Sequence, residues 1–399
     1  MRHRDTIHDE QADQRQDERP ARQRIPAPGW LLAIAGGLAA IAAAVAEPTA
    51  AGQAAGQDWQ PFVLVAGLLL IGLVADRDGL FEAGGHQLAR LARSGVALYC
   101  GAAVLIGVVT ALLNLDTSVA FLTPVLVYTA RRRGGGEAPL LYGCLLLSNA
   151  GSLLLPGSNL TNLIVLGHLH LSGALFLSRM WLAWLAALTV TALVLAVTQR
   201  RELLLPASGP DDGARRPVFG LGLAAVLAAT AAVVALRAPA LPVLAVGLAV
   251  VVARGWQRRI TARDALAVAG LPVLTGLFGI AVALGVLGRV WSGPAVLLTH
   301  LDSWATAGFA AVAAVLVNNL PAASLLAART PGHPFALLVG LNIGPNLLAS
   351  GSLAWILWLK SARTAGADPS LGRASRLGAV TVPLAMAAAL AALMLTGAA

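Results

Sequence analysis

Apolar segments long enough to cross a bilayer follow one another along nearly the whole sequence. A helix of roughly 20 apolar residues spans a hydrocarbon core of about 30 Å. The composition agrees with this reading, because 57% of the residues are hydrophobic and only 12% are charged, whereas soluble domains carry about 25% charged residues. The sequence therefore predicts an all-α polytopic membrane protein.

One apolar segment is interrupted by polar residues and a helix break. Within the run 139–167, the stretch 148–162 holds Asn, Ser and Thr side chains around Pro156 and Gly157. Broken backbone at this depth is tolerated only where protein or a watery cavity covers it, and discontinuous helices mark the substrate sites of transporters. The stretch predicts the floor of a solute site. The alternative is a kinked helix whose Ser and Asn side chains join neighbouring helices.

A second kind of interruption lies upstream. Residues 95–113 and 119–130 are apolar, and the polar residues Asn114 to Ser118 separate them. Arginines flank the whole piece, which places both of its ends on the same side of the membrane. We therefore expect a re-entrant hairpin whose tip, 114–117, reaches the membrane interior. The alternative is a single span followed by an interfacial helix.

The second half of the chain repeats this order. An interrupted piece at 305–328 has Asn318 to Pro321 at its centre, and a broken segment at 335–359 carries polar residues at 342–352. Spans flank these pieces in both halves. The pattern predicts about nine full or broken transmembrane helices plus two re-entrant hairpins, arranged as an inverted repeat, which is a transporter architecture.

The basic residues indicate the topology. When the N-terminus is placed in the cytoplasm, all Lys and Arg residues fall in cytoplasmic segments except Arg179, Arg237, Arg289 and Arg329. This skew fits the positive-inside rule. It predicts a multi-pass protein of the plasma membrane with an external loop at 47–60. The first hairpin then opens to the cytoplasm and the second to the exterior.

The predicted organisation has four parts. A disordered cytoplasmic tail covers residues 1–28, the first transport repeat 29–198, a cytoplasmic linker 199–217, and a linking helix with the inverted second repeat 218–399. The net charge of +9 comes from Arg clusters between apolar segments, so it predicts contact with anionic lipid and no nucleic-acid partner.

Asp116 is the one carboxylate that the sequence places deep in the membrane. An ionisable group there costs a few kcal/mol on insertion scales, so its presence indicates a use. It can carry the coupling proton or help to bind Na⁺. The structural alternative is a helix cap at the hairpin tip, where a carboxylate accepts from free backbone amides.

The remaining candidate site consists of amides, hydroxyls and helix ends. We expect helix N-termini after Asn159 and Ser350 to favour an anion or oxyacid. No Lys or Arg lies at this depth, which favours a neutral solute or an anion brought in with cations. The predicted binding residues are Asn114, Asp116, Thr117, Asn149, Ser152, Ser158, Asn159, Thr161, Asn162, Asn318, Asn319, Asn342, Asn346, Ser350 and Ser352.

Five segments together resemble the arsenical-pump membrane protein family of the ion transporter superfamily, which also holds citrate-transporter-like and sodium symporter families. These segments are Asp76-Arg-Asp-Gly-Leu-Phe-Glu82, Asn114–Pro124, Ser148-Asn-Ala-Gly-Ser152 with Ser158-Asn-Leu-Thr-Asn162, Asn318-Asn-Leu-Pro321, and Gly340–Asn346 through Gly351–Leu359. The resemblance covers nearly all of the chain after the tail. It implies secondary transport, with arsenite or antimonite expelled in exchange for protons, or with sodium-coupled carboxylates in relatives. The chain departs from the pump pattern at Asn342, where Asp is expected, and at Asn346, where Lys is common.

The sequence thus predicts a proton-coupled exporter of a metalloid oxyacid such as arsenite or antimonite. The alternatives are a sodium- or proton-coupled carboxylate or inorganic anion transporter, a Na⁺/H⁺ antiporter, a channel, and a membrane-embedded enzyme. The enzyme is disfavoured because no His/Asp/Glu cluster marks a catalytic surface. We expect no cofactor and no metal, H⁺ or Na⁺ as the coupling ion, and a small solute and the lipid bilayer as partners. A homodimer and a separate ATPase subunit remain open.

Overall fold

The computed structural model describes residues 28–167, 169, 171–204, 220–236 and 238–398, which form helices and no β-strand. The helices before the linker are α2 (Pro28–Ala46), α3 (Pro48–Arg77), α4 (Leu80–Leu91), α5 (Gly95–Leu112), α6 (Leu115–Arg132), α7 (Ala138–Gly151), η1 (Pro156–Ser158), α8 (Leu160–Leu166), α9 (Gly173–Thr198) and α10 (Arg200–Leu203). Those after it are α11 (Leu221–Ala235), α12 (Ala240–Trp256), α13 (Ala262–Ala269), α14 (Leu271–Val290), α15 (Gly293–His300), α16 (Ser303–Val317), α17 (Asn319–Leu326), α18 (Pro334–Ile343), η2 (Gly344–Leu347), α19 (Ala354–Thr364) and α20 (Leu371–Leu395).

The helices confirm a polytopic membrane fold. Six helical segments are long and apolar enough to cross a membrane, and several shorter apolar helices accompany them. Large apolar side chains such as Leu38, Leu193 and Leu316 stay exposed on the outside of the bundle. Such surface is unfavourable in water and suits contact with lipid.

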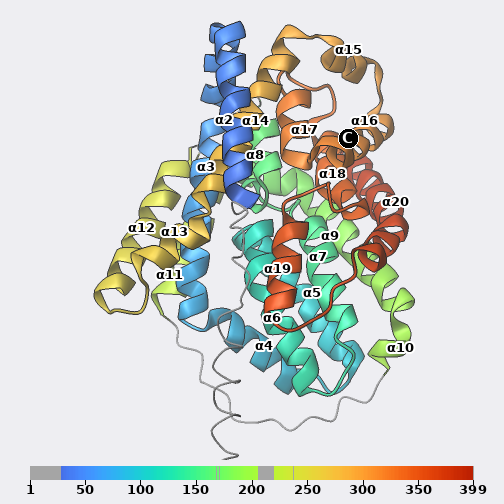
Figure 1. Ribbon diagram of the computed structural model, residues 1–399. Coiled ribbons are helices and arrows are strands. Elements are labelled where there is room, and N and C mark those ends of the chain that lie inside the picture. Colours follow the sequence, from blue (N-terminus) through green and yellow to red (C-terminus); the bar gives the residue numbers. More distant parts are fainter. Residues whose placement is uncertain (1–27, 168, 170, 205–219, 237, 399) are drawn as a thin grey trace, which may run out of the picture.

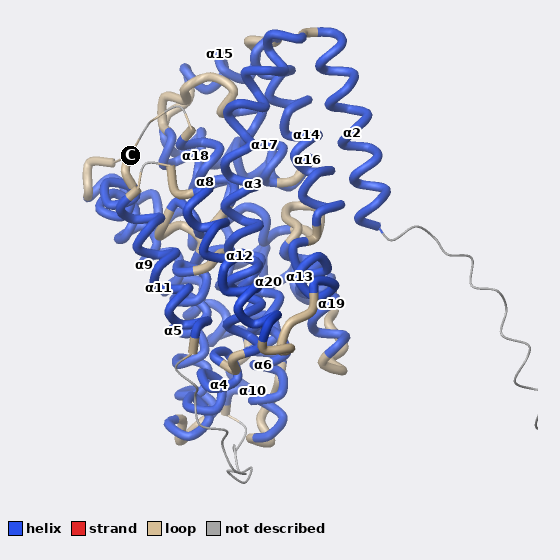
Figure 2. The backbone as a smooth tube through the Cα atoms, turned by 90° about the vertical axis from the view of Figure 1, so that its left-hand side faces the viewer, coloured by secondary structure: helices blue, strands red, loops and turns tan. Residues whose placement is uncertain are grey.

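Both predicted hairpins are present and point in opposite directions. α5 and α6 lie in the lower half of Figure 1 and meet α4 at the lower end, whereas α16 and α17 lie in the upper half, and Figure 2 shows the same separation from the side. At the open end of the first hairpin, Arg133 Nη2 donates to Ala92 O over 2.6 Å. This bond joins the residues that follow α6 to those that precede α5, so the piece 95–130 is a hairpin and not a single span.

Both broken helices are also confirmed. In the first, α7 ends at Gly151 and α8 starts at Leu160, with the short turn η1 between them. In the second, α18 ends at Ile343, η2 follows, and α19 starts at Ala354. Pro156 and Pro345 each lie in the short turn, where the missing backbone donor needs no helical partner.

The two repeats are interlocked by close glycine crossings. α2 packs along α14, and a Cβ built on Gly36 would lie 1.9 Å from the carbonyl oxygen of Gly276. α3 packs along α12 in the same way, and a Cβ on Gly247 would lie 2.7 Å from the carbonyl oxygen of Gly67. Small residues let helix backbones approach closely in a membrane, where packing takes the place of the hydrophobic driving force. Each repeat thus supplies helices whose glycine faces pack closely against the other repeat.

One expected segment boundary was wrong. The predicted external loop 47–60 is the first part of α3, which runs unbroken through Pro61. The apolar segment 262–290 is long enough to cross a membrane, and Gly270, with a positive φ of 57°, divides it into α13 and α14. Most of the predicted tail 1–28 and of the linker 199–217 lies outside the described residues.

Candidate functional site

Amide side chains of the first helix break form hydrogen bonds with backbone groups of the same break. Asn159 caps α8, where its Oδ1 accepts from Thr161 N over 3.3 Å. Asn162 Nδ2 donates to Ser152 O over 2.8 Å and to Leu155 O over 3.1 Å. These carbonyls have lost their helical partners at the break, and a buried unpaired carbonyl is costly. The amides therefore stabilise a non-helical turn inside the bundle.

The second break meets the first through one side chain, that of Asn342. Its Oδ1 accepts from Asn159 Nδ2 over 2.8 Å and from Thr161 Oγ1 over 2.6 Å, while its Nδ2 donates to Asn162 Oδ1 over 2.6 Å. All four side chains are buried. Asn342 belongs to α18 and its three partners to the α8 region, so this cluster joins the two repeats at their breaks.

The first hairpin tip lies against the first break. Asn114 caps α6 by accepting from Thr117 N over 2.6 Å, and Ser118 Oγ lies 3.1 Å from Ser148 Oγ on α7. From the break, Ser158 Oγ donates to Ala111 O over 3.0 Å. Hydroxyl contacts thus fix the tip of α5–α6 beside the end of α7.

The second hairpin tip lies against the second break in the same manner. Asn318 takes a positive φ of 79°, and its Nδ2 donates to Ser350 O over 3.2 Å. Asn319 N donates to Gly351 O over 2.8 Å. Each hairpin tip therefore lies against the break of its own repeat, and the breaks are joined to each other through Asn342.

Several buried polar atoms of the predicted site have no hydrogen-bond partner among the described residues. One is an amide donor, two are amide acceptors and two are hydroxyls. They are Asn114 Nδ2, Asn149 Oδ1, Asn346 Oδ1, Thr117 Oγ1 and Ser352 Oγ.

Three of these residues lie on elements that touch. Asn346 Nδ2 donates to Leu146 O over 3.0 Å, which brings η2 against α7 one turn before Asn149. Ser148, the neighbour of Asn149, contacts α6 one residue beyond Thr117. Each unpaired buried polar group costs about 1–3 kcal/mol. A bound solute or ion that offers both donors and acceptors would remove this cost.

Asp116 lies in the first turn of α6 and is partly buried. No hydrogen bond or ion pair of its side chain occurs in the described part of the chain. The cap of α6 is Asn114, so the alternative role of Asp116 as the helix cap is excluded.

The other predicted residues separate into two groups. Ser152 accepts from Asn159 Nδ2 over 3.3 Å and belongs to the buried cluster. Ser350 is exposed and donates to Val315 O over 2.7 Å. α19 starts at Ala354, a few residues after Ser350, and Leu353 precedes it without a side-chain cap.

Asp58 is a buried carboxylate that was not among the predicted site residues. Asp58 on α3 is only 2% exposed, and Oδ1 has no hydrogen-bond partner among the described residues. It lies beside Ser324 of α17 and Arg289 of α14, and Arg289 Nη2 in turn donates to Gln57 Oε1. Asp116 is therefore not the only carboxylate in the interior. The missed signal was the Ala-rich stretch after Pro48, which is typical of the first turns of a helix.

A cavity of about 580 Å³ opens beside Asp58. It is lined by Gln53, Gln57, Gly167, Arg289, Ala328 and Arg329. It lies at the upper end of the bundle, between α3, α14 and the residues that follow α8 and α17. No group of three His, Cys, Asp or Glu side chains placed to hold a metal ion occurs in the described part of the chain.

Known proteins resemble this chain along most of its length. Residues 24–358 match the profile of the family described as citrate transporter (CitMHS). A relative from Escherichia coli, the "Arsenical pump membrane protein", is 24% identical over 335 residues, which are 75% of this chain and 78% of the relative. The crystal structure of the YdaH transporter from Alcanivorax borkumensis has a similar fold, with a TM-score of 0.53, 17% identity and 88% of each chain covered.

Proposed function

Because the chain belongs to the citrate transporter family, we propose that it is a secondary transporter that exports a small neutral oxyacid in exchange for protons. Undissociated arsenous or antimonous acid is the proposed substrate. The relative from E. coli named an arsenical pump membrane protein supports this choice of substrate. The proposed location is the plasma membrane, with the N-terminus in the cytoplasm.

One observation carries the proposal: two buried amide oxygens of the candidate site, Asn149 Oδ1 and Asn346 Oδ1, have no hydrogen-bond donor among the residues that the structure describes. A neutral oxyacid has O–H groups that donate to such oxygens, and its oxygens accept from Asn114 Nδ2. An ionised carboxylate can only accept hydrogen bonds. The described cluster around Asn342 contains no Lys or Arg that would balance its negative charge.

The same oxygens also support a second candidate function. Amide and hydroxyl oxygens ligate hard cations such as Na⁺, and bound sodium would supply the positive charge that a carboxylate needs. The family description, citrate transporter, points to carboxylates. Sodium-coupled transport of a carboxylate is therefore the alternative.

Everted membrane vesicles that contain the protein should take up arsenite when their lumen is acidic, with no need for Na⁺. Uptake is measured as vesicle arsenic by mass spectrometry, with vesicles lacking the protein as the control and collapse of the pH gradient as a second control. Citrate movement that requires Na⁺, together with no arsenite uptake, would replace the proposed function by the alternative.

Cysteine labelling is expected to place Arg131–Arg133 in the cytoplasm. In a chain whose own Cys100 and Cys144 are replaced by Ser, Arg132→Cys should react with a membrane-impermeant maleimide only in everted vesicles. Arg329→Cys, at the opposite end of the bundle, is the matched control and should react only in intact cells. Labelling of position 132 from outside would invert the proposed orientation.

A further inference from the structure

A second cavity lies where α9 ends and α20 begins. Its volume is about 530 Å³, and residues 197–202 and Arg373 line it. Three of the lining side chains are arginines (Arg200, Arg201 and Arg373) and one is a carboxylate (Glu202), so the cavity has a net charge of two positive units. It lies at the lower end of the bundle, where the 26-residue span α9 leaves the apolar layer.

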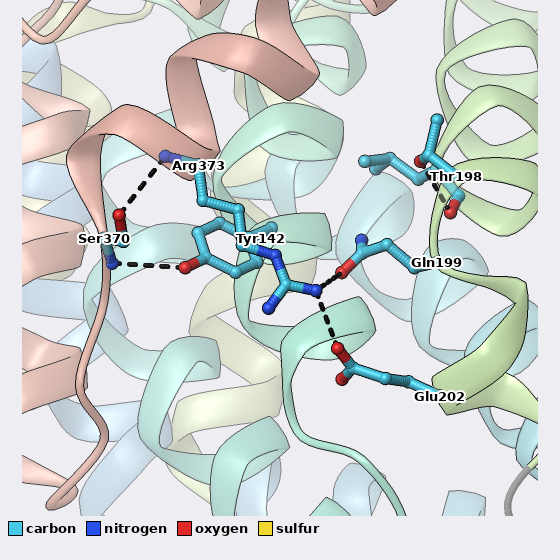
Figure 3. A network of polar contacts seen from close by, with 7 residues as sticks. Tyr142, Thr198, Gln199, Glu202, Ser370 and Arg373 are labelled. Carbon is cyan, nitrogen blue, oxygen red and sulfur yellow. Dashed lines mark hydrogen bonds and ion pairs between the residues drawn. The ribbon is translucent and has the colours of Figure 1, made fainter.

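One arginine is held in place by the protein (Figure 3). Arg373 Nη2 donates to Glu202 Oε1 over 2.6 Å and to Gln199 Oε1 over 3.3 Å, and its guanidinium lies 5.1 Å from the centre of the Tyr142 ring. Tyr142 Oη in turn accepts from Ser370 N over 3.1 Å. These contacts fix one wall of the cavity to α7, the helix that carries Asn149.

The other two arginines are available for a ligand. Arg200 and Arg201 are both exposed. In the part of the chain that the structure describes, neither side chain forms an ion pair, whereas Arg373 does. Two uncompensated guanidinium groups beside a cavity favour a ligand with anionic oxygens, since Arg matches phosphate in charge and geometry.

Gln199 gives an independent indication of an acceptor in the cavity. Its side chain is only 4% exposed and lines the cavity. Its Oε1 is paired with Arg373, but its Nε2 has no acceptor among the described residues. A buried amide N–H without a partner is costly, and a phosphate oxygen in the cavity would satisfy it.

We propose that this cavity binds the phosphate of an anionic phospholipid, with Arg200, Arg201 and Gln199 as its ligands. A lipid is favoured over free phosphate because apolar surface continues from the cavity along the span. On α9, Val197 is 66% exposed and Leu193 59% exposed, and Leu185 follows two turns further on. This stripe can carry an acyl chain while the headgroup sits among the arginines, and basic pockets at the ends of membrane helices bind anionic headgroups.

The test measures lipid binding, not transport. Purified protein is titrated with phosphatidylglycerol, phosphatidylcholine or inorganic phosphate, and bound lipid is counted by native mass spectrometry. The wild type should retain one phosphatidylglycerol in preference to phosphatidylcholine. The double variant Arg200→Gln/Arg201→Gln should bind phosphatidylglycerol about thirtyfold more weakly, because each Arg near an anionic headgroup contributes about 1 kcal/mol and about 1.4 kcal/mol corresponds to a factor of ten.

Two further variants keep the result interpretable. Gln199→Glu retains the acceptor for Arg373 but removes the unpaired donor, so it should also weaken binding without loss of the fold. Arg258→Gln/Arg259→Gln removes another exposed arginine pair, beyond α12, and should bind like the wild type. Equal retention by the Arg200/Arg201 variant and this control would overturn the site, and displacement of the lipid by millimolar inorganic phosphate would reassign it to a free anion.

Discussion

Replacing Asp116 with Asn should abolish transport driven by a proton gradient while the protein stays folded. Asp116 is partly buried at the tip of the first hairpin, and Asn114 already caps α6. The amide keeps the size and polarity of the carboxyl group but cannot release a proton. Arsenite uptake by everted vesicles with an acidic lumen should therefore fall to the level of vesicles without the protein, whereas arsenite exchange at equal pH should persist.

Asp302→Asn is the matched control for this experiment. Asp302 caps α16 of the mirrored hairpin by accepting from Ala305 N over 2.8 Å, but it is exposed. Asn caps helices about as well as Asp, so proton-driven uptake should be unchanged. If Asp116→Asn also keeps full proton-driven uptake, the coupling role passes to Asp58, the buried carboxylate beside Arg289.

Replacing Asn342 with Ala should have the largest effect on stability. The change removes the three side-chain hydrogen bonds that join the two breaks and leaves Thr161 Oγ1 and Asn162 Oδ1 buried without their cross-repeat partner. Each of these two groups costs about 1–3 kcal/mol, so the free energy of unfolding should fall by about 2–6 kcal/mol. Thermal unfolding in detergent measures this loss, and transport should fall with it because the breaks no longer hold one geometry.

Ser350→Ala offers the comparison within the same broken helix. Ser350 is exposed and its hydroxyl contacts only Val315 O, so its removal should change the unfolding temperature by little. A melting curve of Asn342→Ala that matches that of Ser350→Ala would show that the cluster between the breaks contributes no stability.

The sequence predicts the architecture well because a helix break within an apolar segment shows in the sequence as polar residues, Pro and Gly. Pro156 and Gly157 inside an apolar run favour an interrupted helix over a continuous one, and the arginines that flank 95–130 favour a hairpin over a single span. Both features recur after the linker, so the inverted repeat follows from the sequence. Its division into the predicted domains stays a prediction where it depends on the tail and the linker.

The sequence predicts the contacts of the site less well. It identifies Asn159, Thr161, Asn162 and Asn342 as polar residues at the correct depth, but only the packing of α18 against α8 shows that they bond to one another. Asp58 was missed because 47–60 contains Gly, Gln and Glu and resembles a loop, although α14 packs on this part of α3 and Ser324 of α17 lies beside Asp58. Periodicity along one helix carries no information about which distant helix covers it.

The interlocked helices constrain how the chain is made. A ribosome releases α2 and α3 into the bilayer long before it has synthesised α14 and α12, the helices that cover Gly36 and Gly67. Until then, the glycine faces of the first repeat meet only lipid, which cannot approach the backbone as closely as a second glycine does. The first half of the protein should therefore complete its folding only after the last half has been inserted. Biogenesis of this protein should be most vulnerable to protease during that interval, and a chain that stops at the linker should be degraded unless the second half is supplied as a separate polypeptide.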